Sequence, residues 1–172
     1  MVRSREVDED VVREKALDLL SFREHSGKEL LEKLLARKFP RNLSMKVIHD
    51  LERGDLLNDM RFARNLVRYT LKSRPLGRRA MVSLLCRKGL TLDSAQEIVS
   101  SVMQEEGVDE QLLIRKFLEK QLKGGDVDEK RWKKAGNSLL RRGFDGSTVR
   151  ELLAEIRQAG VYEDVEDCVE EL

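Results

Sequence analysis

Basic side chains at helical spacing are the residues of this sequence with the clearest capacity for chemistry. Arg61, Arg64, Arg68 and Lys72 recur at intervals of three, four and four, which places them in one stripe along a helix. Guanidinium and ammonium groups in such a stripe attract the phosphates of a nucleic acid or an acidic protein surface. From residue 60 to residue 90 the chain has no acid and nine basic candidates for such contacts: Arg61, Arg64, Arg68, Lys72, Arg74, Arg78, Arg79, Arg87 and Lys88.

A second basic cluster surrounds the sole tryptophan of the sequence. Residues 111–144 include ten basic and four acidic side chains. Trp132 can stack on an exposed base, a contact that contributes ~1–3 kcal/mol, or it can be the large core residue of a small bundle. Its neighbours are candidate contacts under either interpretation. The candidates in this part of the chain are Lys130, Arg131, Lys133, Lys134, Arg141 and Arg142.

The basic stripe also has a plainer interpretation. Over the 172 residues, 33 Lys and Arg nearly cancel 32 Asp and Glu, so net charge indicates no partner. Residues 91–110, however, hold six acids and no base. If they fold against the stripe, the resulting surface ion pairs would contribute only roughly 0–1 kcal/mol each. The stripe would then be a neutralised helix face, and the sequence leaves both interpretations open.

Other side chains offer little chemistry. Cys86 and Cys168 are too isolated for a disulfide framework or a zinc site, and His25 and His49 have no partner at metal-ligand spacing. Gly124-Gly125-Asp126 lacks the Lys and Ser/Thr of a phosphate-binding loop. We therefore expect histidines with structural or solvent-exposed roles, a Cys86 that packs as a small apolar residue, and no enzyme, metal or cofactor. No apolar run approaches the ~18 residues of a membrane span, so we expect a soluble cytoplasmic protein without membrane contact.

The elements that position these cations recur three times. Leu34–Phe39, Leu85–Leu90 and Leu139–Phe144 align without a gap at offsets of 51 and 54 residues, and an apolar pair follows each eight and nine positions later. A period of this size, with apolar residues at three and four, predicts stacked helical units. The predicted fold is all-α, with three tandem three-helix repeats in an elongated, curved array. Its expected parts are a charged segment 1–10, repeats 11–58, 59–108 and 109–160, and an acidic tail 161–172.

Local signals set the expected helix ends. Ser26 with Glu29 has the form of a capping box, and three further residues are expected as N-caps: Asp59, Thr91 and Asp145. Glycines can close a last helical turn in the left-handed conformation, and Lys38 takes this place in the first repeat. We expect the glycine closures at Gly54, Gly89 and Gly143 and a flexible joint at Gly124-Gly125. The expected helices are 11–23, 27–38, 44–53, 60–73, 77–88, 92–104, 109–122, 128–142 and 146–159.

The second repeat resembles the most recognisable segment of a known family. Leu57-Asn58-Asp59-Met60-Arg61-Phe62-Ala63 is followed by Arg74, Gly77, Leu85 and Lys88-Gly89-Leu90, and Ser26–Leu34 is similar to the first repeat of the same pattern. This order and spacing are similar to the RecX family, regulators of the bacterial recombinase RecA, over about residues 11 to 159. Departures from the pattern are Lys38 in place of a glycine, Pro75-Leu76 before Gly77, and the tail.

The resemblance implies a non-enzymatic modulator, mainly an inhibitor, and we expect it to be a monomer. It would lie in the groove of the RecA–DNA filament, contact single-stranded and double-stranded DNA, and restrain ATP hydrolysis, strand exchange and co-protease activity. Two alternatives remain at this stage. A stand-alone DNA-binding protein would read bases from helix-turn-helix modules, and a helical scaffold for another protein would bind no nucleic acid. The acidic tail is either a solubilising end or a competitor of DNA for the basic face.

Overall fold

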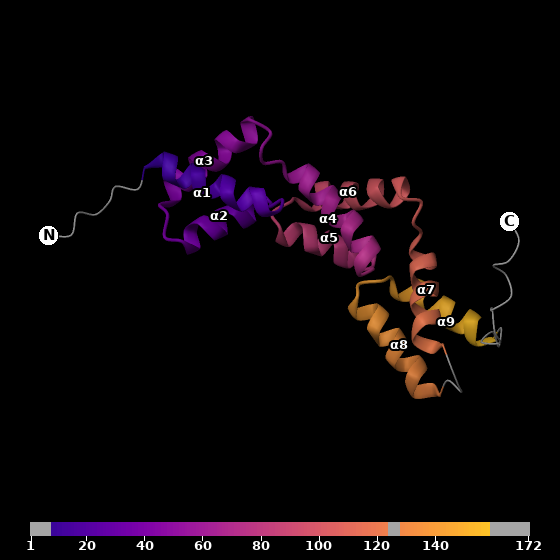
Figure 1. The fold of residues 1–172 in the computed structure, drawn as a ribbon. Coiled ribbons are helices and arrows are strands. Elements are labelled where there is room, and N and C mark those ends of the chain that lie inside the picture. Colours follow the sequence, from indigo (N-terminus) through magenta and orange to yellow (C-terminus); the bar gives the residue numbers. More distant parts are fainter. Residues whose placement is uncertain (1–7, 124–127, 159–172) are drawn as a thin grey trace, which may run out of the picture.

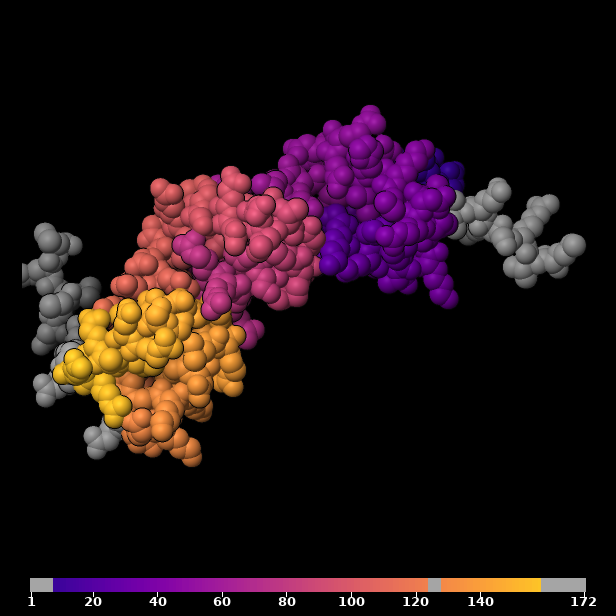
Figure 2. Space-filling model, turned by 180° about the vertical axis from the view of Figure 1, so that it is seen from behind, coloured from indigo at the N-terminus to yellow at the C-terminus, as the bar shows by residue number. Residues whose placement is uncertain are grey.

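Helices alone make up the fold of the described residues. The computed structural model describes residues 8–123 and 128–158, and within them it has nine α-helices and no strand. Figure 1 shows the helices in an elongated row that bends at the third bundle, and Figure 2 shows the same bent row in a space-filling view from behind. The predicted all-α repeat class is therefore confirmed. The expected joint at Gly124-Gly125 and the acidic tail 161–172 lie outside the described residues.

The helices pack in three groups of three, as the repeat predicts. The helix pairs with the most extensive contact always consist of two members of the same group. The first bundle contains α1 (Glu9–Phe22), α2 (Gly27–Ala36) and α3 (Arg41–Arg53). The second contains α4 (Asp59–Ser73), α5 (Arg78–Arg87) and α6 (Leu92–Glu105), and the third contains α7 (Glu110–Leu122), α8 (Glu129–Arg141) and α9 (Gly146–Gln158).

Helix ends show which local signals were sufficient. The Thr91 and Asp145 side chains accept hydrogen bonds from the first turns of α6 and α9, as expected. Ser26 caps α2, but the Glu29 carboxylate pairs with Lys88 and Arg23, so the structure shows only the Ser26 half of the capping box. Asp59 is not the N-cap of α4. Asn58 is, with its side-chain oxygen 2.9 Å from the amide nitrogen of Arg61.

Left-handed residues close helices at three of the four expected places. Gly89 and Gly143 have φ angles of 109° and 76°, and Lys38 has 67°. The expectation for Gly54 is wrong, because its φ is −85° and Asp55 takes the left-handed conformation at 53° instead. Asp tolerates this conformation because its side chain hydrogen-bonds locally, and here its carboxylate accepts from Asn58 at 2.8 Å.

The three bundles do not have three separate cores. Val12, Leu30, Leu34 and Val47 belong to a cluster of buried residues that stays within the first bundle. A second cluster runs continuously through the second and third bundles, from Ala63 to Leu152. A bundle of about 50 residues buries little apolar surface, so sharing a core stabilises both members of this pair. The molecule is therefore one small bundle joined to one larger six-helix body.

A backbone contact holds the second and third bundles together. The amide of Gly77 donates to the carbonyl oxygen of Arg142 at 2.9 Å. A Cβ atom at Gly77 would lie 2.3 Å from the backbone of Gly143 and Phe144, and one at Gly143 would lie 2.5 Å from Cβ of Ala80. Only glycine allows these two backbone segments to approach so closely. The shared core depends on this approach, because Phe144 is buried directly beside it.

His25 is a buried histidine at the end of the first bundle. It is 2% exposed, its Nδ1 lies 2.9 Å from the carbonyl oxygen of Arg23, and its Nε2 has no hydrogen-bond partner among the described residues. Because a carbonyl only accepts, Nδ1 carries the proton and Nε2 is bare. Burial lowers the pKa of His25 below its ordinary range. The expectation of structural or solvent-exposed histidines fits both residues, because His25 is buried and His49 is exposed.

Buried His25 should make the free energy of unfolding depend on pH. This free energy should decrease as the pH falls below about 6.5, the ordinary pKa of histidine, because His25 binds a proton more readily in the unfolded chain than in the folded protein. Urea unfolding at about pH 7.5 and about pH 5.5 measures this difference. His25→Gln should flatten the dependence in this window, and His49→Gln should leave it intact. An unchanged pH dependence in His25→Gln would assign the effect to other groups.

Candidate nucleic-acid interface

Acids from α6 meet the basic stripe on α4. Arg64 pairs with Glu105, and Arg68 pairs with Glu105 at 2.9 Å and with Glu106 at 3.0 Å. Hydrogen bonds from Arg64 and then Ser101 lower the pKa of Glu105. The last turn and the C-cap of α6 therefore neutralise the middle of the stripe, as the plainer interpretation predicted. A phosphate would have to displace these carboxylates to reach either arginine.

The ends of the stripe differ from each other. At the first end, Arg61 pairs with Glu24 and Asp55, both at 3.2 Å, and also donates to the backbone oxygen of Asp55. At the other end, Lys72 is exposed and forms no ion pair with any residue that the structure describes. The four residues of the predicted stripe thus lie on one helix, but only Lys72 has a charge that no described acid neutralises.

Ion pairs and polar contacts, rather than a shared core, connect the first bundle to the second. Lys88 pairs with Glu29, and Glu24 accepts from Arg61 and Asn65. Burial alone would raise the pKa of Glu29, but the hydrogen bonds from Lys88 and Arg23 outweigh it and lower this pKa. Lys88 was a candidate contact for RecA or DNA. In the structure it forms an ion pair within the molecule instead, because the packing of the two bundles places Glu29 beside it.

Asp59 has an unexpected place in this junction. Its Oδ1 accepts from the amide of Gly27 at 2.7 Å, at the N-terminus of α2 in the neighbouring bundle. The residue is therefore a helix cap, as its type suggested, but for a helix 32 residues away in sequence. The partial positive charge of a helix N-terminus favours such a carboxylate. No spacing signal within one bundle could have revealed this pairing.

Asp59→Ala should lower the free energy of unfolding by ~1–2 kcal/mol, because it leaves the buried amide of Gly27 without its acceptor. Asp59→Asn keeps an oxygen at the same place and should recover most of the loss. Urea denaturation of the two variants tests this expectation. Equal stability of Asp59→Ala and the parent would show that solvent replaces the carboxylate at no cost.

The basic residues of α5 divide into anchored and exposed groups. The Arg78 guanidinium donates to Ser100 Oγ at 2.6 Å and its amide donates to Glu110 at 2.9 Å. Arg87 donates to Ser83 one turn earlier, at 2.8 Å. Arg79, between them, is exposed and forms no ion pair with the described part of the chain. Arg79 is therefore the candidate of α5 with the fewest internal constraints.

The basic residues of α8 surround a partly buried tryptophan. Trp132 packs against the shared core, which favours the core interpretation over an exposed stacking platform. Arg131 donates to the carbonyl oxygen of Gln121 at 3.3 Å, and Lys133 lies 4.0 Å from Glu129. Arg142 is held over the ring of Phe117, 4.8 Å from its centroid. Contacts within the molecule thus restrain half of this cluster, two residues through another helix and Lys133 through its own.

Six candidate cations are exposed, and their side chains form neither an ion pair nor a hydrogen bond with any described residue; we call them the free cations. Three of them flank the contact between Gly77 and Gly143, because they lie within three residues of it in sequence: Arg74, Arg79 and Arg141. The carbonyl of Pro75 also accepts from Arg142 at 3.4 Å across the same junction. The other free cations are Lys72, Lys130 and Lys134. An uncompensated basic surface therefore borders the junction of the second and third bundles.

The described residues form neither a metal-binding cluster nor a membrane-spanning helix. No group of three His, Cys, Asp or Glu side chains there could hold a metal ion. None of the helices in residues 8–123 and 128–158 has the length and apolar character that crossing a bilayer requires. Cys86 is half-buried against the shared core, as expected of a small apolar residue.

Comparisons with known proteins agree on one family. The family model "RecX, first three-helix domain" matches residues 13–51. The regulatory protein RecX of Chlorobium limicola is 33% identical over 147 residues, which cover 84% of this chain and 89% of the relative. RecX of Stenotrophomonas maltophilia (strain K279a) is 33% identical over 150 residues, which cover 86% of this chain and 88% of the relative.

Solved structures share the fold. The crystal structure of RecX from Lactobacillus salivarius has a TM-score of 0.65 at 21% identity, and covers 87% of this chain and 97% of its own. A second crystal structure, of a regulatory protein RecX, has a TM-score of 0.66 at 19% identity, and covers 86% of this chain and 71% of its own. At this identity the likeness concerns the fold alone. It nevertheless shows that the arrangement of helices recurs in these proteins.

Proposed function

This chain belongs to the RecX family, and from this premise we propose that it is a non-enzymatic regulator of RecA that acts mainly as an inhibitor. It binds as a monomer, in the cytoplasm, in the groove of the RecA–DNA filament. There it restrains ATP hydrolysis, strand exchange and co-protease activity. The family membership carries the choice of RecA as the target, and the resemblance in residues 57–90 supports it.

The shape of the molecule suits a filament. An elongated row of bundles presents a long surface that can follow a helical groove (Figure 1). Several weak contacts along successive subunits then combine, because each bound contact raises the effective concentration of the next. To restrain RecA, the bound protein must prefer one state of the filament, since equal affinity for all states shifts no equilibrium.

The free cations support contact with single-stranded DNA, and also with duplex DNA, through phosphates. Arg74, Arg79 and Arg141 carry charges that no described acid neutralises, so phosphates can approach them without displacing a carboxylate. Arg64 and Arg68, in contrast, are already paired. The same free cations suit acidic surfaces of RecA, and the paired arginines remain contact candidates only if Glu105 and Glu106 are displaced.

A stand-alone helix-turn-helix protein is less well supported. Such a protein inserts the N-terminal part of a recognition helix into the major groove. The corresponding helix of the second bundle is α6, whose first half carries Asp93 and Glu97 and no basic residue. Carboxylates at this place repel the phosphate backbone, so the geometry favours a regulator that contacts DNA through another face.

ATP hydrolysis by RecA on single-stranded DNA should fall when this protein is titrated from far below one copy per RecA subunit. Inhibition at such levels is expected, because capping or destabilising a filament affects many subunits at once. The measurement is the hydrolysis rate at constant RecA and DNA. Inhibition only near saturation of the DNA would indicate competition for the strand, and a rate unchanged at every ratio would overturn RecA as the target.

A further inference from the structure

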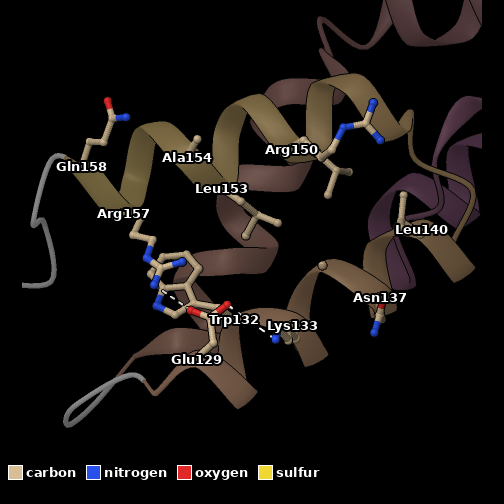
Figure 3. A pocket seen from close by; sticks show the side chains of 12 residues that line it. Glu129, Trp132, Lys133, Asn137, Leu140, Arg150, Leu153, Ala154, Arg157 and Gln158 are labelled. Carbon is tan, nitrogen blue, oxygen red and sulfur yellow. Dashed lines mark ion pairs between the residues drawn. The ribbon is translucent and has the colours of Figure 1, made fainter.

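An apolar groove lies between α8 and α9, at the end of the molecule farthest from the first bundle. Its volume is about 440 Å³. Figure 3 shows Trp132 and Leu140 on α8 and Leu153 on α9 lining it. Leu140 is 47% exposed, and Gly136 at the floor permits the close approach of Leu153, whose Cδ1 would be 3.0 Å from an added Cβ. The two helices thus present an apolar strip along the groove.

The rim of this groove is basic. Lys133, Arg150 and Arg157 line it together with a single carboxylate, Glu129. Glu129 pairs with Arg157 at 2.6 Å and lies 4.0 Å from Lys133, as the dashed lines in Figure 3 mark. Arg150 forms no ion pair within the described residues. The groove therefore combines an apolar floor with an excess of positive charge, which fits an acidic, amphipathic segment.

The C-terminal sequence of the same chain has this composition. Residues 161–172 contain six acids and no base. Projected at 100° per residue, the apolar side chains occupy an arc of about 120°, and every acid falls outside it. The apolar side chains are Val161, Tyr162, Val165, Cys168, Val169 and Leu172. The pattern is that of a segment with one apolar and one acidic face.

We propose that residues 161–172 bind in the α8–α9 groove, with their apolar side chains on Trp132, Leu140 and Leu153 and their acids at the basic rim. Gln158, the last residue of α9, lines the groove itself, so only two residues separate it from the segment. Such a short connection gives an effective concentration on the order of mM, which favours this segment over a second copy or an external protein. The bound tail would also screen basic side chains of the third bundle.

The sole tryptophan of the chain reports directly on this contact, because Trp132 lines the groove. In the full-length protein, Val165→Ser with Val169→Ser keeps the charge and removes two apolar contacts. The docking equilibrium should shift by on the order of 100-fold toward the open groove. Trp132 emission should move to longer wavelength, and acrylamide quenching should increase. Val11→Ser, at an exposed position of α1, is the control and should change neither.

A second variant acts from the groove side. Arg150→Glu places a carboxylate opposite the acidic segment and should expose Trp132 in the same way, and raising the salt concentration should weaken docking in the parent by screening. Emission and quenching that are identical in the parent and both variants would overturn the proposal. A parent signal that changes with protein concentration would also overturn it, by showing that a second copy occupies the groove.

Discussion

Gly77→Ala should lower the free energy of unfolding by about 3 kcal/mol, because the new methyl group would have to occupy the space of the facing backbone. The added Cβ would lie 2.3 Å from atoms of Gly143 and Phe144. Backbone atoms cannot turn aside as a side chain can, so the second and third bundles must separate. The separation would open the shared core at Phe144 and break the hydrogen bond from Gly77 to Arg142.

Gly54→Ala is the matched control for this prediction. Like Gly77, Gly54 caps a helix and has a negative φ, of −85°, but its added Cβ would meet the nearest backbone oxygen at an ordinary 3.5 Å. Its unfolding free energy should change by no more than about 0.5 kcal/mol. Urea denaturation compares the two variants. If Gly77→Ala is as stable as Gly54→Ala, the contact between the bundles is not a close one in solution.

Replacing Arg74, Arg79 and Arg141 together with glutamine should weaken binding to single-stranded DNA by on the order of 100-fold at about 0.1 M salt. Each phosphate contact contributes about 0.7 to the slope of log affinity against log salt, so the slope should decrease by roughly 2. The physical reason is that the charges of these three free cations are not already balanced by acids of the chain. Fluorescence anisotropy of a labelled oligonucleotide at several salt concentrations measures both quantities.

The paired arginines give the matched comparison. Arg64→Gln with Arg68→Gln removes cations whose charge is already compensated by Glu105 and Glu106. The salt slope should therefore change by much less than in the triple variant. The reverse order of effects would mean that the α4 stripe is the binding surface and that its ion pairs open when DNA binds.

Much of the fold was readable from the sequence because its signals are local. The alternation of apolar residues at three and four gave all nine helices of the described ranges in the correct order, and the side chains of Thr91 and Asp145 marked two starts. The repeat at offsets of 51 and 54 residues indicated three similar bundles. Gly89 and Gly143 marked helix ends because a left-handed residue is favoured there by backbone sterics alone.

The sequence by itself thus determined the helices, their grouping and the presence of many cations. Only the tertiary structure decided which cations remain uncompensated, because Glu105 reaches Arg64 and Glu29 reaches Lys88 from segments 41 and 59 residues away. The same holds for Asp59, which caps a helix of another bundle, and for Gly77, which touches Gly143. Helix periodicity and caps depend on neighbours within a few residues, whereas ion pairs and bundle contacts depend on how the finished bundles pack.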